Sequence, residues 1–278
     1  MSSLDSADQP ESQQLEDLLP AERRQRLIEW FETRVAASNQ ELSRLLNTSV
    51  STVRRDLDLL ATQGLVRRTH GGAVRIRRRS TFEPSLEEAE RSATEEKRAI
   101  ALEAAKRLEP DQSLLLDTGS TLHELAYVIA RLDMPLTVVT NDVLIARILA
   151  ELRHIKLIVP GGSLREGSFT LLGEPGVTFL REVHCDVFFL CAQAVNEDSA
   201  SDISTEAVQL KRAMLDSAAR SVLLVDSSKF GTRAFYRIAP MSRFNEIITD
   251  GGIDPNERAR IEARGIPLTC ATPNDEDE

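Results

Sequence analysis

Cysteine is scarce in this sequence, and long apolar runs are missing from it. The three cysteines, Cys185, Cys191 and Cys270, are widely spaced and form no Cys-X-X-Cys pair, so they indicate neither a disulfide framework nor a zinc knuckle. No apolar stretch approaches the ~18 residues of a membrane span, and the sequence begins acidic and polar where a signal peptide is basic and then apolar. We expect a cytoplasmic protein with no membrane contact, no bound metal and no cofactor.

The distribution of charge is more informative than the total. Over 278 residues the net charge is -10, which argues against a nucleic-acid binder. Residues 1–22 carry six acids and no base, but residues 23–79 carry thirteen arginines against five acids, a net charge of +8. The rest of the chain is acidic again. A basic segment in an acidic chain indicates an anionic partner for that segment alone.

The apolar spacing that starts at Pro20 predicts three helices. A stripe beginning at Leu27 marks the first, and the capping box Ser38–Glu41 begins the second. Ser49 is placed to cap the third, over residues 50–62. Two short helices joined by a few polar residues make a helix-turn-helix, whose second helix enters a DNA major groove.

On that third helix the core positions leave a polar face exposed. Val53, Leu57 and Leu60 would be buried, with Gly64 as the helix stop. The side chains then left exposed near the helix start are Ser51, Thr52, Arg54 and Arg55. An arginine there can bond guanine in a bidentate contact, and the hydroxyls suit phosphate oxygens or a thymine methyl. The alternative for each arginine is a surface salt bridge with Asp56 or Asp58.

A wing follows the third helix. Residues 65–69 and 73–76 are predicted strands joined by a tight turn at His70–Gly72. His70 is interpreted as a structural or phosphate-contacting residue, because no other His or Cys lies at metal-ligand spacing. Residues 20–76 are thus predicted to form a winged helix-turn-helix domain. The predicted DNA contacts are Ser49, Ser51, Thr52, Arg54, Arg55, Arg68, His70 and Gly71.

The segment from Arg23 to Val74 resembles the amino-terminal domain of the DeoR family of bacterial transcriptional regulators. The Arg-Arg-Asp-Leu run at 54–57, followed by His-Gly-Gly-Ala at 70–73, carries the resemblance. It implies a regulator that binds a double-stranded DNA operator. Because two-fold operators require at least a dimer, we expect a homodimer or homotetramer.

Beyond the basic segment the pattern changes. Residues 77–92 show no apolar period and contain Pro84, so they are predicted to be a linker. Over residues 93–271 short apolar strands alternate with amphipathic helices, which predicts a Rossmann-like α/β domain with a parallel sheet covered on both faces. Residues 1–19 and 272–278 are predicted acidic tails, the first of them disordered.

Four of the predicted strands end in polar loops. These loops are Asp117–Thr121, Thr140–Asn141, Pro160–Gly162 and Asp226–Lys229. Because the carboxyl ends of parallel strands share one edge of a sheet, we expect the loops to converge there and to bind a ligand. Glycine and hydroxyls before a helix suit a phosphate in the first loop. The alternative is an ordinary strand-to-helix turn with a capping serine or threonine.

This second region resembles the effector domain of the same family, whose fold is shared with ribose-5-phosphate isomerase. The resemblance implies a phosphorylated sugar as effector and adds Lys211 to the site, although either Lys211 or Lys229 could instead be a surface lysine. The predicted effector-binding residues are Asp117, Thr118, Gly119, Ser120, Thr121, Thr140, Asn141, Gly161, Gly162, Lys211, Asp226 and Lys229.

The sequence departs from the family pattern near the end of one strand. Cys191, Ala194 and Asp202 stand where the family usually has glycine, and Ser204 stands where it usually has threonine. Such side chains would narrow the pocket floor. We expect Cys191 itself to be a small buried apolar residue.

Two functions remain open at this level. The first is a DNA-binding transcriptional regulator, a repressor of a carbohydrate catabolism operon controlled by a phosphorylated sugar, with no enzymatic activity. The alternative is a sugar-phosphate isomerase-like enzyme that carries a DNA-binding module. An isomerase needs a carboxylate base beside its substrate, for which Asp117 and Asp226 are the candidates.

Overall fold

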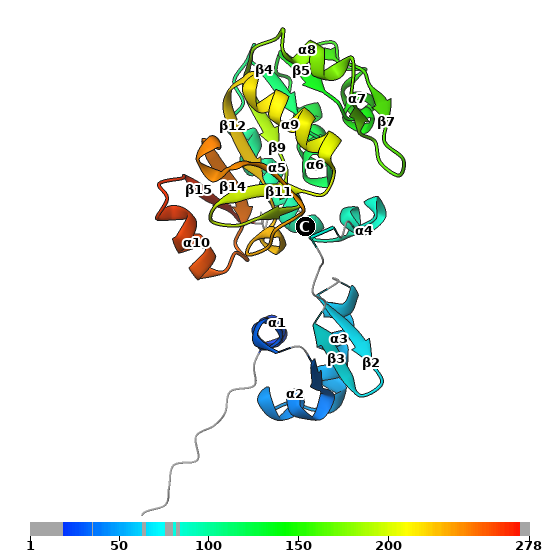
Figure 1. Ribbon diagram of the computed structural model, residues 1–278, viewed down its shortest axis with the longest axis vertical. Coiled ribbons are helices and arrows are strands. Elements are labelled where there is room, and N and C mark those ends of the chain that lie inside the picture. Colours follow the sequence, from blue (N-terminus) through cyan, green and yellow to red (C-terminus); the bar gives the residue numbers. More distant parts are fainter. Residues whose placement is uncertain (1–18, 35, 63–64, 76–79, 82–83, 273–278) are drawn as a thin grey trace, which may run out of the picture. The chain divides into compact units, whose positions relative to one another are not determined.

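The chain forms two compact units, divided between Arg77 and Arg78 (Figure 1). The computed structural model describes residues 19–34, 36–62, 65–75, 80–81 and 84–272. Almost all of the two predicted acidic tails lies outside the described residues, as do the helix stop at Gly64, the wing end at Ile76 and residues 77–79 of the predicted linker. Within the described ranges, no helix is long and apolar enough to cross a membrane.

The first unit is a winged helix-turn-helix. Its elements are α1 (Pro20–Thr33), β1 (Ala36–Ser38), α2 (Asn39–Leu45), α3 (Val50–Thr62), β2 (Val66–Thr69) and β3 (Gly72–Arg75). The three predicted helices and the two strands of the wing are confirmed. The strand β1 was not predicted, and it pairs antiparallel with β3 to give the sheet order β1-β3-β2.

Local sequence signals account for the boundaries of this unit. The Ser38 N–H donates to Glu41 Oε2 at 2.8 Å and the Glu41 N–H donates to Ser38 Oγ at 3.2 Å, which confirms the predicted capping box. Val53, Leu57 and Leu60 are buried, as their spacing predicted. They pack with Leu27 and other apolar residues of α1, α2 and the wing, so one small core holds the unit together.

The second unit is built on a seven-stranded parallel sheet of order β15-β14-β12-β9-β4-β5-β6 (Figure 1). Its strands are β4 (Ser113–Leu116), β5 (Leu136–Thr140), β6 (Ile155–Ile158), β9 (Cys185–Leu190), β12 (Ala218–Leu224), β14 (Glu246–Asp250) and β15 (Leu268–Ala271). Every neighbouring pair is parallel. The predicted Rossmann-like parallel-sheet architecture is therefore confirmed.

Helices cover both faces of this sheet. They are α4 (Leu86–Arg91), α5 (Thr94–Ala105), α6 (Ser120–Arg131), α7 (Val143–Leu149), α8 (Gly176–Leu180), α9 (Thr205–Asp216) and α10 (Pro255–Glu262), with 3-10 turns at Ser227–Lys229 and Met241–Arg243. Leu114 and Leu116 of β4 pack with residues of α5, α6 and α7, and Leu115 packs with residues of α8, α9 and α10. The alternation of side chains along each strand thus fills two cores, one on each face.

Smaller elements were not predicted from the sequence. A hairpin is formed by β7 (Ser163–Leu164) and β8 (Leu171–Leu172), and an antiparallel sheet of order β10-β11-β13 is formed by β10 (Ala194–Val195), β11 (Ser199–Asp202) and β13 (Tyr236–Pro240). Helix α4 lies inside the predicted linker. Its start has the capping-box pattern, since the Ser85 N–H donates to Glu88 Oε2 at 2.8 Å.

The order of the strands locates a ligand-binding crevice. The chain enters the sheet at β4, moves outward through β5 and β6, and then returns to the other side of β4 with β9. Ligands of open parallel sheets bind outside the carboxyl ends of the strands at such a reversal. The fold therefore predicts a ligand site at the loops that follow β4 and β9.

Gly72 has no room for a side chain. A Cβ built there would lie 2.0 Å from the carbonyl oxygen of Ala37 in β1, whereas a Cβ at Gly71 meets nothing within 4 Å. We expect Gly72→Ala to lower the free energy of unfolding of the first unit by about 1 to 3 kcal/mol through forced overpacking. Trp30 is the single tryptophan and belongs to α1, so urea unfolding followed by its fluorescence reports on this unit.

Gly71→Ala is the matched control for this measurement and should unfold close to wild type. Equal unfolding midpoints for Gly72→Ala and Gly71→Ala would show that the contact between β1 and β3 does not restrict position 72.

Candidate DNA-binding surface and effector site

The first turns of α3 present free basic side chains. Arg54 and Arg55 are exposed, and among the described residues neither has an ion-pair or hydrogen-bond partner. The two acids considered as partners are taken, because Arg23 Nε lies 2.6 Å from Asp56 Oδ2 and Arg68 Nε lies 2.7 Å from Asp58 Oδ1. The alternative of a local salt bridge for Arg54 or Arg55 is therefore wrong.

Hydroxyl groups gather at the start of the same helix. Ser49 Oγ accepts the N–H of Thr52 at 3.2 Å, which confirms Ser49 as the cap of α3. It also lies 2.8 Å from Ser51 Oγ and 2.8 Å from Thr52 Oγ1. Ser51 is exposed and Thr52 is half-buried. Hydroxyls beside a helix start suit the phosphate contacts that fix the position of a groove-reading helix.

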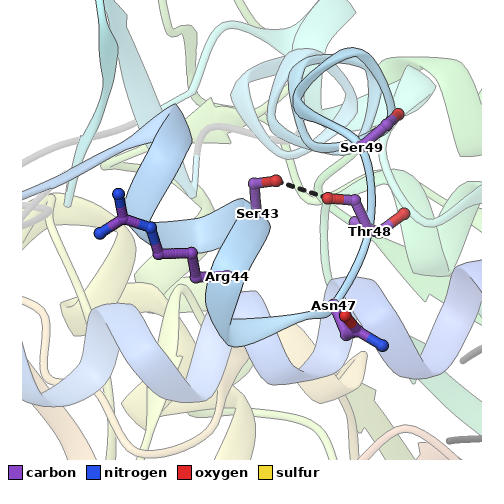
Figure 2. Close-up of a pocket in the computed structure, with 5 residues that line it drawn as sticks. All are labelled: Ser43, Arg44, Asn47, Thr48 and Ser49. Carbon is purple, nitrogen blue, oxygen red and sulfur yellow. Dashed lines mark hydrogen bonds between the residues drawn. The ribbon is translucent and has the colours of Figure 1, made fainter.

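An open recess lies at the turn between α2 and α3 (Figure 2). It is lined by Ser43, Arg44, Asn47, Thr48 and Ser49. Ser43 Oγ donates to the carbonyl oxygen of Thr48 at 2.5 Å, and this bond holds the turn. The recess is polar and extends the hydroxyl-rich surface at the start of α3.

The predicted contacts on the wing fall into two groups. His70 and Gly71 are exposed at the tip of the hairpin. Arg68, in contrast, is bonded to Asp58 of α3, to Asn39 Oδ1 at 3.3 Å and to the carbonyl oxygen of Gly72 at 2.7 Å. Its guanidinium positions the wing against α3. Whether Arg68 also reaches DNA stays a prediction.

The structure brings the four predicted polar loops to the carboxyl edge of the large sheet. Asp117 follows β4, Asn141 follows β5, Gly161 and Gly162 follow β6, and Asp226 follows β12. Most of these side chains are enclosed, since Asp117, Thr121, Thr140, Asn141 and Asp226 are each at most 5% exposed. Thr118, Gly119, Ser120, Gly161, Gly162 and Lys229 are half-buried around them. A ligand that reaches the enclosed groups must therefore displace the protein atoms that cover them.

A buried ion pair occupies the reversal point of the sheet. Lys211 Nζ, on α9, lies 2.6 Å from Asp117 Oδ2 and donates to the carbonyl oxygen of Cys191 at 2.8 Å. Asp202 Oδ2 lies 3.3 Å from the same ammonium. Burial alone would lower the pKa of Lys211, but the charge of Asp117 opposes this and, with Asp202, raises the pKa above its ordinary value. The alternative of a surface lysine is wrong for Lys211.

The charge of this cluster matters for the ligand. Two carboxylates face one ammonium, so Lys211 has no positive charge left over for a phosphate. The cluster is instead suited to the hydroxyl groups of a sugar, which donate to carboxylate oxygens. Asp202, one of the three residues that replace family glycines, supplies the second carboxylate.

Cys191 lies on the floor of the site. Its N–H donates to Asp117 Oδ2 at 3.1 Å, and its thiol donates to the carbonyl oxygen of Thr118 at 2.9 Å. Burial raises the pKa of the thiol to about 12, so it stays protonated. The predicted apolar packing is present, because Cys191 contacts the core around β4. The prediction was incomplete, since the residue is only half-buried and forms polar contacts.

The loop Asp117–Thr121, called the phosphate-cradle loop after its predicted role, has no side-chain cap. Gly119 stands at the N-cap of α6 with φ of 129°, and no side chain bonds the first N–H groups of this helix. The alternative of a turn capped by serine or threonine is therefore wrong. A Cβ at Gly119 would lie 2.9 Å from Cys191 Sγ, and one at Gly162 would lie 2.6 Å from the Leu172 carbonyl oxygen. A glycine is therefore required at position 162, because the backbone of β8 lies too close for a side chain.

Two groups around these loops remain available to a ligand. Asn141 donates through Nδ2 to the carbonyl oxygen of Leu171 at 3.2 Å, but its buried Oδ1 has no partner among the described residues. The ammonium of Lys229 has no partner there either, and the residue is half-buried in the turn that follows Asp226. Asp226 Oδ1 accepts the N–H of Ser228 at 3.1 Å and caps the short turn that carries Lys229.

Sequence reasoning missed a second buried network. Asp142 Oδ2 accepts from Thr118 Oγ1 at 2.7 Å and lies 2.9 Å from His123 Nε2, and Thr170 Oγ1 lies 2.8 Å from Thr118 Oγ1. Burial would raise the pKa of Asp142, but the hydrogen bond and charge of His123 outweigh it and lower the pKa. Nothing in the spacing marks Asp142 or His123 as members of a site. Among the described residues, no group of three or more His, Cys, Asp or Glu side chains is arranged to hold a metal.

Removal of the Lys211 ammonium should destabilise the second unit. Lys211→Met leaves Asp117 buried without its counter-ion, and breaking such a pair costs about 3 to 5 kcal/mol of unfolding free energy. Lys106→Met, which removes a 69% exposed lysine, is the matched control. Calorimetric unfolding checks this, and the double variant Asp117→Asn/Lys211→Met should recover part of the loss. A Lys211→Met protein as stable as Lys106→Met would contradict the role given to the pair.

Comparison with known proteins identifies both units. The family model described as DeoR-like helix-turn-helix domain matches residues 23–79, and the one described as DeoR C terminal sensor domain matches residues 92–251. The chain is 32% identical over 254 residues to the uncharacterized HTH-type transcriptional regulator YulB of Bacillus subtilis, with 91% of this chain and 97% of the relative covered.

Two further relatives have more specific names. The HTH-type transcriptional regulator GlpR of Haloferax volcanii is 33% identical over 252 residues, which cover 90% of this chain and 98% of that protein. The glycerol-3-phosphate regulon repressor of Escherichia coli is 29% identical over 230 residues, which cover 82% of this chain and 90% of the relative.

Proposed function

Because the chain belongs to the DeoR family of transcriptional regulators, we propose that it is a DNA-binding repressor of a carbohydrate catabolism operon, with an operator affinity changed by a phosphorylated sugar. The observation that carries the DNA-binding part is the pair Arg54 and Arg55. Both are exposed on the first turns of α3, while the nearby acids are paired to other arginines. Their charge is therefore free for base edges and phosphates.

The effector site supports a ligand with two chemically different ends. At one end the uncapped start of α6 and the ammonium of Lys229 suit a phosphate. At the other end the carboxylates around Lys211 and the free Oδ1 of Asn141 suit sugar hydroxyls. A relative in Escherichia coli is named as the glycerol-3-phosphate regulon repressor, and glycerol 3-phosphate is a phosphorylated polyol with both kinds of group.

We do not extend the proposal to catalysis. An isomerase needs a carboxylate free to remove a proton from its substrate. Asp117 is bound to Lys211 and to the N–H of Cys191, and Asp226 caps the turn at Ser227–Lys229. Both candidate bases are thus engaged in holding the site together. The regulator would act in the cytoplasm on a double-stranded operator, as a homodimer or homotetramer that places two α3 helices in successive major grooves.

Loss of either free arginine should weaken operator binding. With a duplex selected by the wild-type protein from a random pool, we expect Arg54→Ala and Arg55→Ala each to lose about 1 to 3 kcal/mol of binding free energy. Fluorescence anisotropy measures the affinity. Arg131→Ala, which removes an exposed arginine on α6, is the control and should bind as wild type. Unchanged affinity in both α3 variants would remove α3 from the proposed interface.

Phosphorylated sugars should stabilise the wild-type protein and change its operator affinity. In a panel of ribose 5-phosphate, glucose 6-phosphate and glycerol 3-phosphate, a ligand present at about 100 times its Kd adds about 2.7 kcal/mol to the unfolding free energy. Lys229→Ala should reduce this gain, whereas Lys156→Ala, at an exposed site on β6, should not. Conversion of any compound to its isomer, followed by NMR, would favour the enzyme alternative instead.

A further inference from the structure

Helix α4 is held to the second unit by a lysine that no carboxylate neutralises. Lys97, on α5, is 4% exposed, and its ammonium donates to the carbonyl oxygens of Ala89 and Ser92 at the carboxyl end of α4. Among the described residues no acidic group lies within ion-pair distance of it. Carbonyl oxygens at the carboxyl end of a helix have no hydrogen-bond donor within the helix. The Lys97 ammonium supplies donors to these oxygens of α4, and in doing so its charge is enclosed in the protein.

The same ammonium is within the electrostatic reach of the effector site. The charges that act on Lys97 include the carboxylate of Asp226 and the ammonium of Lys229, both at the carboxyl edge of the sheet, and the carboxylate of Glu96, the preceding residue of α5. Burial is the largest influence and lowers the pKa of Lys97, and the Lys229 charge acts in the same direction. The ammonium of Lys229 thus disfavours the charge on Lys97, and a further negative charge near both lysines would stabilise them.

We propose that Lys97 is an effector-binding residue shared with α4: its ammonium holds the carbonyl end of α4 in one state of the protein, and a phosphorylated effector takes it over and releases that helix. This inference rests on the proposed function, and it adds a residue and a route of signalling to it. The ligand class is a phosphate monoester, whose charged oxygens bond an ammonium more strongly than neutral carbonyl oxygens do.

The balance of charges in the site favours this assignment. Lys211 is neutralised by Asp117 and Asp202, so it has no charge to offer a phosphate. Lys97 and Lys229, in contrast, have no carboxylate at ion-pair distance among the described residues, so their charges can serve a phosphate. The phosphate of the effector is therefore assigned to Lys97 and Lys229 together with the uncapped start of α6, with the sugar hydroxyls toward Asp117 and Lys211.

The attachment of α4 has a second contact with the effector loops. The buried Nδ1 of His123 lies 4.0 Å from Glu90 Oε1 on α4, while its Nε2 lies 2.9 Å from Asp142 Oδ2. Asp142 in turn accepts from Thr118 in the phosphate-cradle loop. This chain of contacts therefore joins α4 to the effector loop that contains Thr118.

The backbone between α4 and α5 is also poised to change. Ala93 has φ of 52°, a left-handed conformation that is unfavourable for a residue with a Cβ. The turn around it is bridged by Lys97, whose N–H donates to the Ala93 carbonyl oxygen at 3.0 Å and whose ammonium reaches Ser92. When the ammonium leaves, fewer bonds oppose relaxation of this turn. Helix α4 follows the division between the two units at Arg77 and Arg78, so its release is a change on the chain segment that leads to the DNA-binding unit.

Hydrogen exchange of α4 with inorganic phosphate as the probe tests the proposal in the full-length protein. In wild type, phosphate should speed amide exchange over residues 86–92 relative to chloride at equal ionic strength. In Lys97→Met, exchange there should already be fast, phosphate should not change it, and the dissociation constant for phosphate should rise at least tenfold. Lys106→Met, at the exposed end of the same helix, should respond as wild type. Lys97→Arg, which keeps the charge, should restore part of the response.

The outcomes separate this inference from the proposed function. If phosphate leaves α4 exchange unchanged in wild type, or if Lys97→Met binds phosphate as wild type does, Lys97 is not the shared residue. Sugar phosphates that still shift operator affinity equally in wild type and Lys97→Met would leave the repressor function standing and overturn only the inference. If no sugar phosphate shifts operator affinity in wild type, the proposed function fails, whatever the exchange of α4 shows.

Discussion

The ion pair between Asp117 and Lys211 is the interaction on which the effector site depends. It joins the end of β4 to α9 at the point where the strand order reverses, and the Cys191 backbone that follows β9 bonds to both partners. A pair enclosed in this way stabilises only while both partners are present and satisfied. It therefore fixes the floor of the site, and it removes the most enclosed lysine from the set of groups that can hold a phosphate. Charge for the ligand has to come from elsewhere.

The same argument applies to the basic segment of the DNA-binding unit. Its thirteen arginines give a large positive charge, but they do not all serve the same purpose. Arg23 is bound to Asp56 of α3, and Arg68 ties the wing to Asp58 and to the backbone of Gly72. These two arginines hold the helices and the wing in place. Arg54 and Arg55 are left exposed by that arrangement, so these structural pairs keep the nearby acids from binding Arg54 and Arg55.

Spacing along the chain predicted the elements well where one local period decides the structure. The helices around Leu57, the wing and the strand Leu114–Leu116 follow from apolar periodicity and turn residues, and the edge where the polar loops meet follows from the parallel order. The strand β1 could not be predicted, because three residues have no period and its pairing with β3 joins segments far apart in the sequence. Helix α4 was missed although its capping box is visible, because none of its residues is buried and the pattern has no apolar face.

The site residues divide in the same way. Asp117 and Gly119 were found because they follow a strand, whereas His123 and Lys97 lie inside helices where histidine and lysine carry no positional signal. Their importance comes from burial combined with partners on other elements, which only the folded chain shows. A lysine enclosed among carbonyl oxygens with no carboxylate partner is a costly arrangement. The ammonium of Lys97 can bond either to the carbonyl oxygens of α4 or to a phosphate at the effector loops, which gives two states of the protein. A ligand shifts an equilibrium only through a difference in its affinity for the two states. The exchange of Lys97 between carbonyl oxygens and a phosphate supplies that difference.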